Sequence, residues 1–81
     1  MNSFVATFFD HYGAVQFRTW CKQQDLNCVL QPVPRSLSSS CGTCAVYESA
    51  GWETGYDPDQ IEAVYQKEKS GYVLMHRSEE A

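Results

Sequence analysis

A short stretch in the middle of the chain constrains the fold more than any other part of the sequence. Residues 34–44 (PRSLSSSCGTC) contain a proline, an arginine, four serines, a glycine and two cysteines. Proline, glycine and serine favour turns over helices and strands, and apolar, strand-like runs precede and follow this stretch. We interpret it as a loop between two strands, and the chain as a small scaffold that presents Cys41.

The length of the chain limits how much core it can form. At 81 residues it fits one domain with a thin core. Its content of 43% hydrophobic and 14% aromatic residues is typical of a globular domain and not of a disordered segment. We expect a single domain over residues 1–81, in which residues 78–81 form a frayed tail.

Four runs rich in β-branched and aromatic residues predict strands. They lie at residues 3–9, 27–33, 43–49 and 72–77. The prolines in the second run indicate an edge strand, because an edge position tolerates a missing N–H group.

Two helices are predicted between these strands. The first spans about residues 11–24, because Asp10 is a suitable N-cap and apolar residues follow it at helical spacing. The second begins at Pro58, because Asp57 and Pro58 together form a helix start signal. It ends before Gly71, which is a helix stop signal.

The resulting order, β-α-β-β-α-β, predicts an α+β fold of the ferredoxin-like class. This fold has a four-stranded antiparallel sheet with two helices on one face, and its usual strand order is 4-1-3-2. The other face of the sheet is then uncovered, and one of two sets of first-strand side chains must point to it, either Phe4, Ala6 and Phe8 or Val5, Thr7 and Phe9. We therefore expect a homodimer through the open sheet face, or a partner protein docked there.

Charge and hydropathy exclude several classes of function. The formal net charge is −4 and the six Lys and Arg residues are scattered, so we expect no nucleic-acid partner. No run approaches the ~20 apolar residues of a membrane span, and the N-terminus lacks the basic region of a secretion signal. We expect no membrane association and a cytoplasmic location.

The four cysteines are expected to be reduced thiols. A disulfide framework in so short a chain is typical of secreted proteins. A four-cysteine zinc site usually has two close pairs on turns, whereas Cys21 lies in a helical pattern and Cys28 in a strand-like pattern. We expect no metal and no cofactor, and we interpret Cys21 and Cys28 as packing residues.

Cys41 is the candidate nucleophile of the central loop. The predicted topology puts it beside the amino end of the first helix, where a thiolate is stabilised. The candidate groups around its sulfur are two cations and the hydrogen-bond donors of the loop, namely Arg35, His11, Ser38, Ser39, Ser40 and the amide of Gly42. Cys44 lies three residues further on, where it could act as a resolving thiol.

The run from Pro32 to Gly42 (PVPRSLSSSCG) resembles the signature of a family of small bacterial proteins described as selenium/sulfur carriers. The resemblance extends over about residues 3–77. It implies that the cysteine of the Ser-Ser-Ser-Cys-Gly segment, here Cys41, holds sulfur or selenium as a persulfide-like species. It also implies donor and acceptor proteins as partners. This sequence departs from the family pattern at Cys44, where a small apolar residue is usual, and in a longer loop that carries Trp52.

Several functions remain open at the level of the sequence. The leading hypothesis is a carrier, and not a stand-alone enzyme, that accepts sulfur or selenium on Cys41 and passes it on. One alternative is a dithiol redox protein or soft-metal-binding module that uses Cys41 and Cys44. The other is a non-catalytic interaction or helper subunit whose loop only makes a tight turn.

Overall fold

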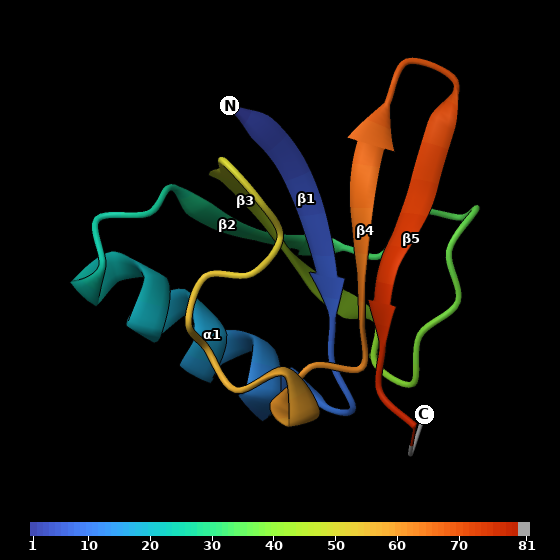
Figure 1. Cartoon of the computed structure of the whole chain (residues 1–81). Helices are drawn as coiled ribbons and strands as arrows, with labels where there is room; N and C mark the ends of the chain where they lie inside the picture. Colours follow the sequence, from blue (N-terminus) through green and yellow to red (C-terminus); the bar gives the residue numbers. More distant parts are fainter. Residues whose placement is uncertain (80–81) are drawn as a thin grey trace.

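The computed structural model describes residues 1–79 of the chain. Within them, one α-helix and one turn of 3-10 helix accompany a five-stranded antiparallel sheet with the strand order β2-β3-β1-β4-β5 (Figure 1). The elements in chain order are β1 (Asn2–Thr7), α1 (His11–Gln23), β2 (Cys28–Pro32), β3 (Thr43–Ser49), η1 (Pro58–Gln60), β4 (Ala63–Glu68) and β5 (Gly71–Arg77).

The predicted ferredoxin-like fold, with four strands and two helices, is wrong. The four predicted strands and the first helix are present with small shifts at their ends, but no second α-helix occurs within residues 1–79. The segment predicted as that helix forms η1 and β4, and β4 lies between β1 and β5 in the sheet. The last strand, β5, is at the edge of the sheet as in the predicted order, but its neighbour is β4 and not β1.

The strand β4 forms because β1 pairs on both of its sides. The strand β1 is antiparallel to β3 on one side and to β4 on the other, where Ala6 of β1 lies opposite Val64 of β4. The helix start signal at Asp57 is real but short: its side chain accepts a hydrogen bond from Asp59 N at 3.0 Å, and the helix ends after one turn. Beyond that turn, the β-branched Val64 and the aromatic Tyr65 suit a pleated sheet.

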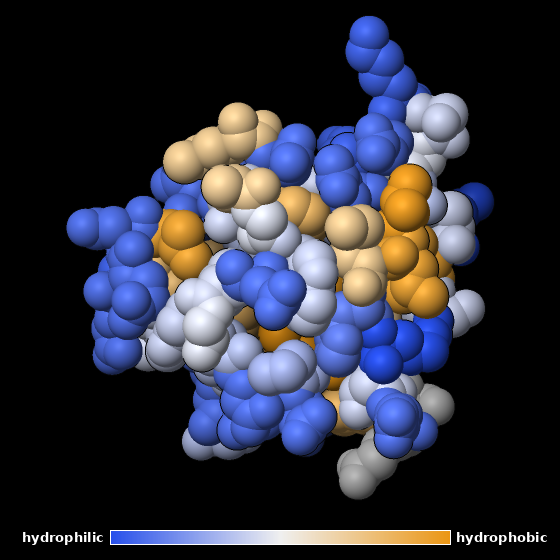
Figure 2. Space-filling view, viewed as in Figure 1, coloured by the Kyte–Doolittle hydropathy of each residue, from blue (hydrophilic) through white to orange (hydrophobic). Residues whose placement is uncertain are grey.

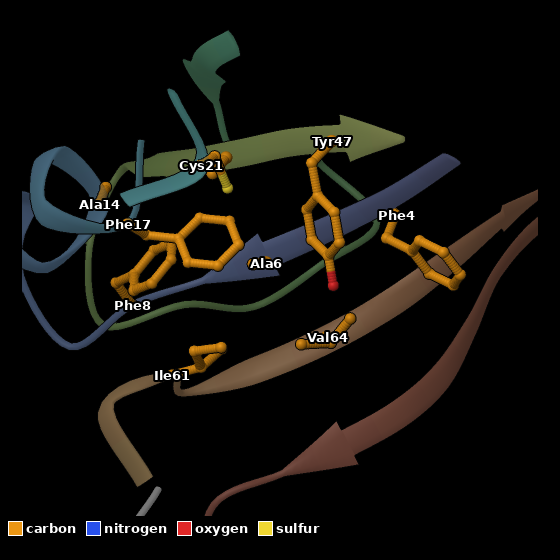
Figure 3. Close-up of a cluster of buried hydrophobic side chains, with 10 residues drawn as sticks. Phe4, Ala6, Phe8, Ala14, Phe17, Cys21, Tyr47, Ile61 and Val64 are labelled. Carbon is orange, nitrogen blue, oxygen red and sulfur yellow. The ribbon is translucent and has the colours of Figure 1, made fainter. Parts of the chain in front are cut away.

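The main core lies between α1 and one face of the sheet. As predicted, Asp10 caps α1, and its carboxylate accepts a hydrogen bond from Gly13 N at 2.8 Å. Figure 3 shows the Phe17 ring between those of Phe8 and Tyr47, with ring centroids 5.5 and 5.2 Å away. The other buried members of this cluster are Phe4, Ala6, Ala14, Cys21, Ala45, Ile61 and Val64.

The second face of the sheet is not open at β1, so this part of the prediction is also wrong. One set of β1 side chains belongs to the α1 core, yet Val5 and Thr7 of the other set are only 2% and 0% exposed. Figure 1 shows residues 33–42, in green, passing behind β4 and β5. The homodimer stays a prediction, but the uncovered apolar surface on β1 that suggested it is not there.

Apolar side chains remain exposed on the edge strand β5. Val73, Leu74 and Met75 are all exposed, and Figure 2 shows apolar surface gathered over this strand.

In the part of the chain that the structure describes, no helix has both the length and the apolar character needed to cross a membrane.

Gly71 allows the tight turn between β4 and β5. Its φ of +142° lies in a region that L side chains rarely adopt. Gly71→Ala is therefore expected to lower the free energy of unfolding by about 1–3 kcal/mol, measured by urea denaturation. Gly51→Ala is the matched control, because Gly51 has no positive φ and an added Cβ meets no atom within 4 Å at either glycine. An equal loss in both variants would contradict the assignment of strain to Gly71.

Candidate functional site

The loop between β2 and β3, residues 33–42, is closed at its base and lies against the end of β1. Val33 N donates to Gly42 O at 3.0 Å, which extends the pairing of β2 with β3. Leu37 N donates to Pro34 O, also at 3.0 Å, and forms a tight turn. Further along the loop, Ser39 Oγ lies 3.4 Å from Phe8 O, just beyond the end of β1. The loop is thus anchored at several points and is not a free linker.

A buried glutamate holds this loop. Glu62 is 5% exposed and precedes β4, and its backbone N donates to Thr7 O at 2.8 Å. Its carboxylate accepts hydrogen bonds from Ser39 Oγ at 2.8 Å, from Ser40 Oγ at 2.5 Å and from Ser40 N at 3.1 Å. We name the group formed by Ser39, Ser40 and Glu62 the serine clamp.

The serine clamp favours the ionised carboxylate of Glu62. Burial acts to raise the pKa of this carboxyl group, because the charged form loses hydration. The hydrogen bonds from Ser40, Ser39 and Thr7 together outweigh burial, so the pKa of Glu62 is lowered from its ordinary value. At neutral pH the clamp is therefore a charged carboxylate surrounded by neutral donors, and charged acceptors make the stronger hydrogen bonds.

The clamp positions the backbone at Cys41. Cys41 N donates to Ser39 Oγ at 3.1 Å, and Thr43 N donates to Cys41 Sγ at 3.4 Å. The Cys41 side chain is partly exposed. The sulfur of this partly exposed residue faces a backbone N–H group, which is a suitable partner for an anionic sulfur.

His11 reaches the site through Thr43. The Nδ1 atom of His11, the first residue of α1, lies 3.1 Å from Thr43 Oγ1, at the start of β3. The first residue of α1 is thus in contact with the first residue of β3, directly after the loop, whereas the predicted position of Cys41 beside the amino end of α1 stays a prediction. In the part of the chain that the structure describes, the side chain of His11 is hydrogen-bonded to that of Thr43 and not to that of Cys41.

The remaining predicted loop residues are arranged differently from the prediction. Arg35 and Ser38 are exposed, and within residues 1–79 neither side chain forms a hydrogen bond or ion pair. Gly42 closes the base of the loop through its carbonyl group, and the amide that faces the sulfur of Cys41 belongs to Thr43. The clamp serines direct their hydroxyl groups at the glutamate and not at the sulfur.

Cys44 lies in the sheet and not in the loop. It is completely buried on β3, and its thiol donates to Pro32 O at 3.6 Å. Successive strand residues point to opposite faces, so Cys44 points away from the side of Thr43 and of the core residue Ala45. Burial raises the pKa of the Cys44 thiol, which makes it a poor nucleophile at neutral pH.

Two residues of the site were missed by the sequence analysis. Glu62 was assigned to a helix, where it would be one more acidic surface residue. The available signal was its position between two apolar residues, Ile61 and Ala63. The structure shows that both are buried. Thr43 was treated only as the start of a strand. Among residues 1–79, no three His, Cys, Asp or Glu side chains are grouped in a way that could hold a metal ion.

Comparison with protein-family models matches residues 3–54 to the family described as "Putative Se/S carrier protein-like". The match includes β1, α1, β2, the loop with Cys41, and β3, and it ends before η1 and Glu62. Comparisons with curated proteins and with solved structures found no match. Because the family match spans more than half of the chain and includes the loop around Cys41, the chain belongs to the selenium/sulfur carrier-like family.

Proposed function

We propose that this chain carries sulfur or selenium on Cys41 as a persulfide-like species. The observation that carries the proposal is the geometry of Cys41: a partly exposed thiol on a loop held by the serine clamp, with the backbone N–H of Thr43 facing its sulfur. The family description supports the class of cargo. A carrier of this kind requires one protein that donates the cargo and another that accepts it.

Loading on Cys41 is a transfer of sulfane sulfur. The Cys41 thiolate attacks the terminal sulfur of a donor persulfide, and a new S–S bond to Cys41 Sγ forms. The donor S–S bond breaks, and the donor thiolate leaves with the electron pair. The step balances without an external oxidant, and delivery to the acceptor is the same exchange with Cys41 as the leaving thiolate. The Thr43 N–H lies beside the sulfur that gains and loses negative charge.

The dithiol alternative, in which Cys44 resolves Cys41, is less well supported. Cys44 is completely buried and hydrogen-bonded to a backbone carbonyl, and it points to the opposite face of β3 from Thr43. A resolving thiol must approach the bound cargo, which would require β3 to rearrange at its start. We therefore assign the carrier role to Cys41 alone.

Mass spectrometry after incubation with a persulfide donor tests the proposal. The wild-type chain is expected to gain the mass of one sulfur atom, on the peptide that contains Cys41. Cys41→Ser should abolish this adduct, whereas the matched variant Cys44→Ser should keep it. A full adduct in Cys41→Ser would contradict the carrier role of Cys41. A wild-type chain that instead loses two hydrogen atoms and links Cys41 to Cys44 would favour the dithiol alternative.

A further inference from the structure

The backbone around Cys41 is held on both sides by side chains from other parts of the fold. Ser40, directly before Cys41, is held by Glu62, which precedes β4. Thr43, two residues after Cys41, is hydrogen-bonded to His11, the first residue of α1. The position of Cys41 thus depends on two contacts from different elements, one on each side of it along the chain.

The sheet holds Thr43 less firmly than the residues that follow it in β3. Among the described residues, the pairing of β3 with β1 ends at Cys44, so Thr43 lies one position beyond it. On its other side Thr43 pairs with Pro32, and a proline has no backbone N–H to donate. One backbone hydrogen bond, from Val33 N to the Gly42 carbonyl, restrains the peptide group that includes Thr43 N. A single contact at the carbonyl oxygen leaves this peptide group free to tilt.

The contact with His11 supplies a second restraint. His11 Nδ1 lies 3.1 Å from Thr43 Oγ1, which is hydrogen-bonding distance whether the ring or the hydroxyl group donates. Thr43 Oγ1 is attached to Cβ, next to the Cα that carries the amide, and this amide donates to Cys41 Sγ at 3.4 Å. A displacement of the hydroxyl group therefore also moves the amide. His11 itself belongs to a well-defined helix end, because the Asp10 carboxylate caps α1 through Gly13 N.

We propose that His11 is a positioning residue for Cys41. It holds Thr43 so that the Thr43 N–H stays directed at Cys41 Sγ, where it stabilises the sulfur whenever that atom is negatively charged. In the proposed function, on which the role of this contact in cargo transfer rests, the sulfur is negative before it attacks a donor and again when it leaves as a thiolate. His11 acts through Thr43 and not on the sulfur itself.

Alkylation of Cys41 by iodoacetamide, followed by peptide mass spectrometry, tests this inference without any cargo. His11→Ala is expected to slow the reaction about 3- to 10-fold at about pH 7.5, because a smaller fraction of the thiol is ionised. The difference should disappear at about pH 10, where a thiol is ionised with or without this stabilisation. His11→Asn should restore most of the lost rate, because its amide group can take the place of Nδ1. Both variants lack the imidazole, so a change in ring charge cannot explain a difference between them.

Thr43→Val tests whether the effect passes through Thr43. It removes the hydroxyl group but keeps the backbone N–H, so we expect it to react as slowly as His11→Ala, and the double variant to react no more slowly than either. Tyr12→Ala is the matched control, because it removes an exposed side chain from the same turn of α1 and should leave the rate unchanged. Additive losses in the double variant, or a His11→Asn variant as slow as His11→Ala, would overturn the proposal.

Loading from a persulfide donor, measured on the same variants, separates this inference from the proposed function. If the wild-type chain takes up no sulfur but the alkylation rates follow the expected pattern, the carrier function is wrong and the positioning role of His11 stands. If the chain takes up sulfur while His11→Ala is alkylated at the wild-type rate, the carrier function stands and His11 has no positioning role.

Discussion

Glu62→Ala is expected to lower the free energy of unfolding by about 2–4 kcal/mol and to release the loop that carries Cys41. The substitution leaves the hydroxyl groups of Ser39 and Ser40, and the amide of Ser40, without their acceptor at a partly buried position. Hydrogen bonds to a charged acceptor are individually stronger than neutral ones, and this carboxylate accepts several of them. Urea denaturation measures the loss of stability. Faster trypsin cleavage after Arg35, in the same loop, measures its release.

Glu68→Ala is the matched control for this prediction. Glu68 is also a carboxylate of the β4 region, but it is exposed and lies at the other end of the strand. Its replacement is expected to change the free energy of unfolding by less than about 0.5 kcal/mol and to leave the trypsin rate unchanged. If Glu62→Ala behaves like Glu68→Ala in both measurements, the serine clamp does not hold the loop.

The contribution of the clamp depends on pH with a definite sign. Because the pKa of Glu62 is lowered in the folded chain, the unfolded chain binds more protons in the acid range. The stabilisation is fully present above the ordinary glutamate pKa of about 4.3 and is lost as the pH falls through the lower folded-state value. The advantage of wild type over Glu62→Gln should therefore shrink as the pH falls from about 6 to about 3. A constant difference over this range would contradict an ionised Glu62.

Phe17→Ala is expected to cost about 3–5 kcal/mol of unfolding free energy, a large fraction of the stability of so small a domain. The Phe17 side chain is completely buried, and its ring centroid lies 5.5 Å from that of Phe8, 5.2 Å from Tyr47 and 5.1 Å from Tyr56. Its removal leaves a cavity where α1 packs on the sheet, because neighbouring rings fill such a space only in part.

Tyr12→Ala provides the comparison for Phe17→Ala. Tyr12 lies on the same helix but is 68% exposed, so its loss should change stability by less than about 1 kcal/mol. Thermal or urea denaturation of both variants measures the difference. Similar losses at the two positions would mean that the packing of α1 on the sheet is not what stabilises the fold.

Local signals were sufficient for the elements of the first half of the chain. Asp10 caps a helix that begins at His11, as its side chain type predicts, and β3 spans the predicted residues 43–49. A capping hydrogen bond joins residues only three positions apart, and the alternation of a strand is read over a few neighbours. The motif that indicates Cys41 is equally local, because it lies within eleven consecutive residues from Pro32 to Gly42.

The prediction for the second half of the chain was wrong because its local signals are compatible with two different structures. Asp57 followed by Pro58 can begin an α-helix or a single 3-10 turn, and a glycine with positive φ can end a helix or form a hairpin turn. A short apolar run between such signals does not distinguish the two structures. Pairing with β1 favours the strand over the helix for residues 63–68. Residues Phe4 to Thr7 of β1 are buried on both faces of the sheet, and the edge of β1 that β3 leaves free pairs with β4.

The sequence by itself therefore determined the first elements and the cysteine to examine, because those signals act between neighbours in the chain. Tertiary structure alone decided what surrounds that cysteine. Glu62 meets Ser39 across 23 positions because pairing of β4 with β1 brings it to the end of β1. The packing of the other elements buries Cys44 within β3 and places Cys28 against the core cluster that contains Cys21. Such contacts depend on which strands become neighbours, and that is a property of the whole sheet and not of any segment.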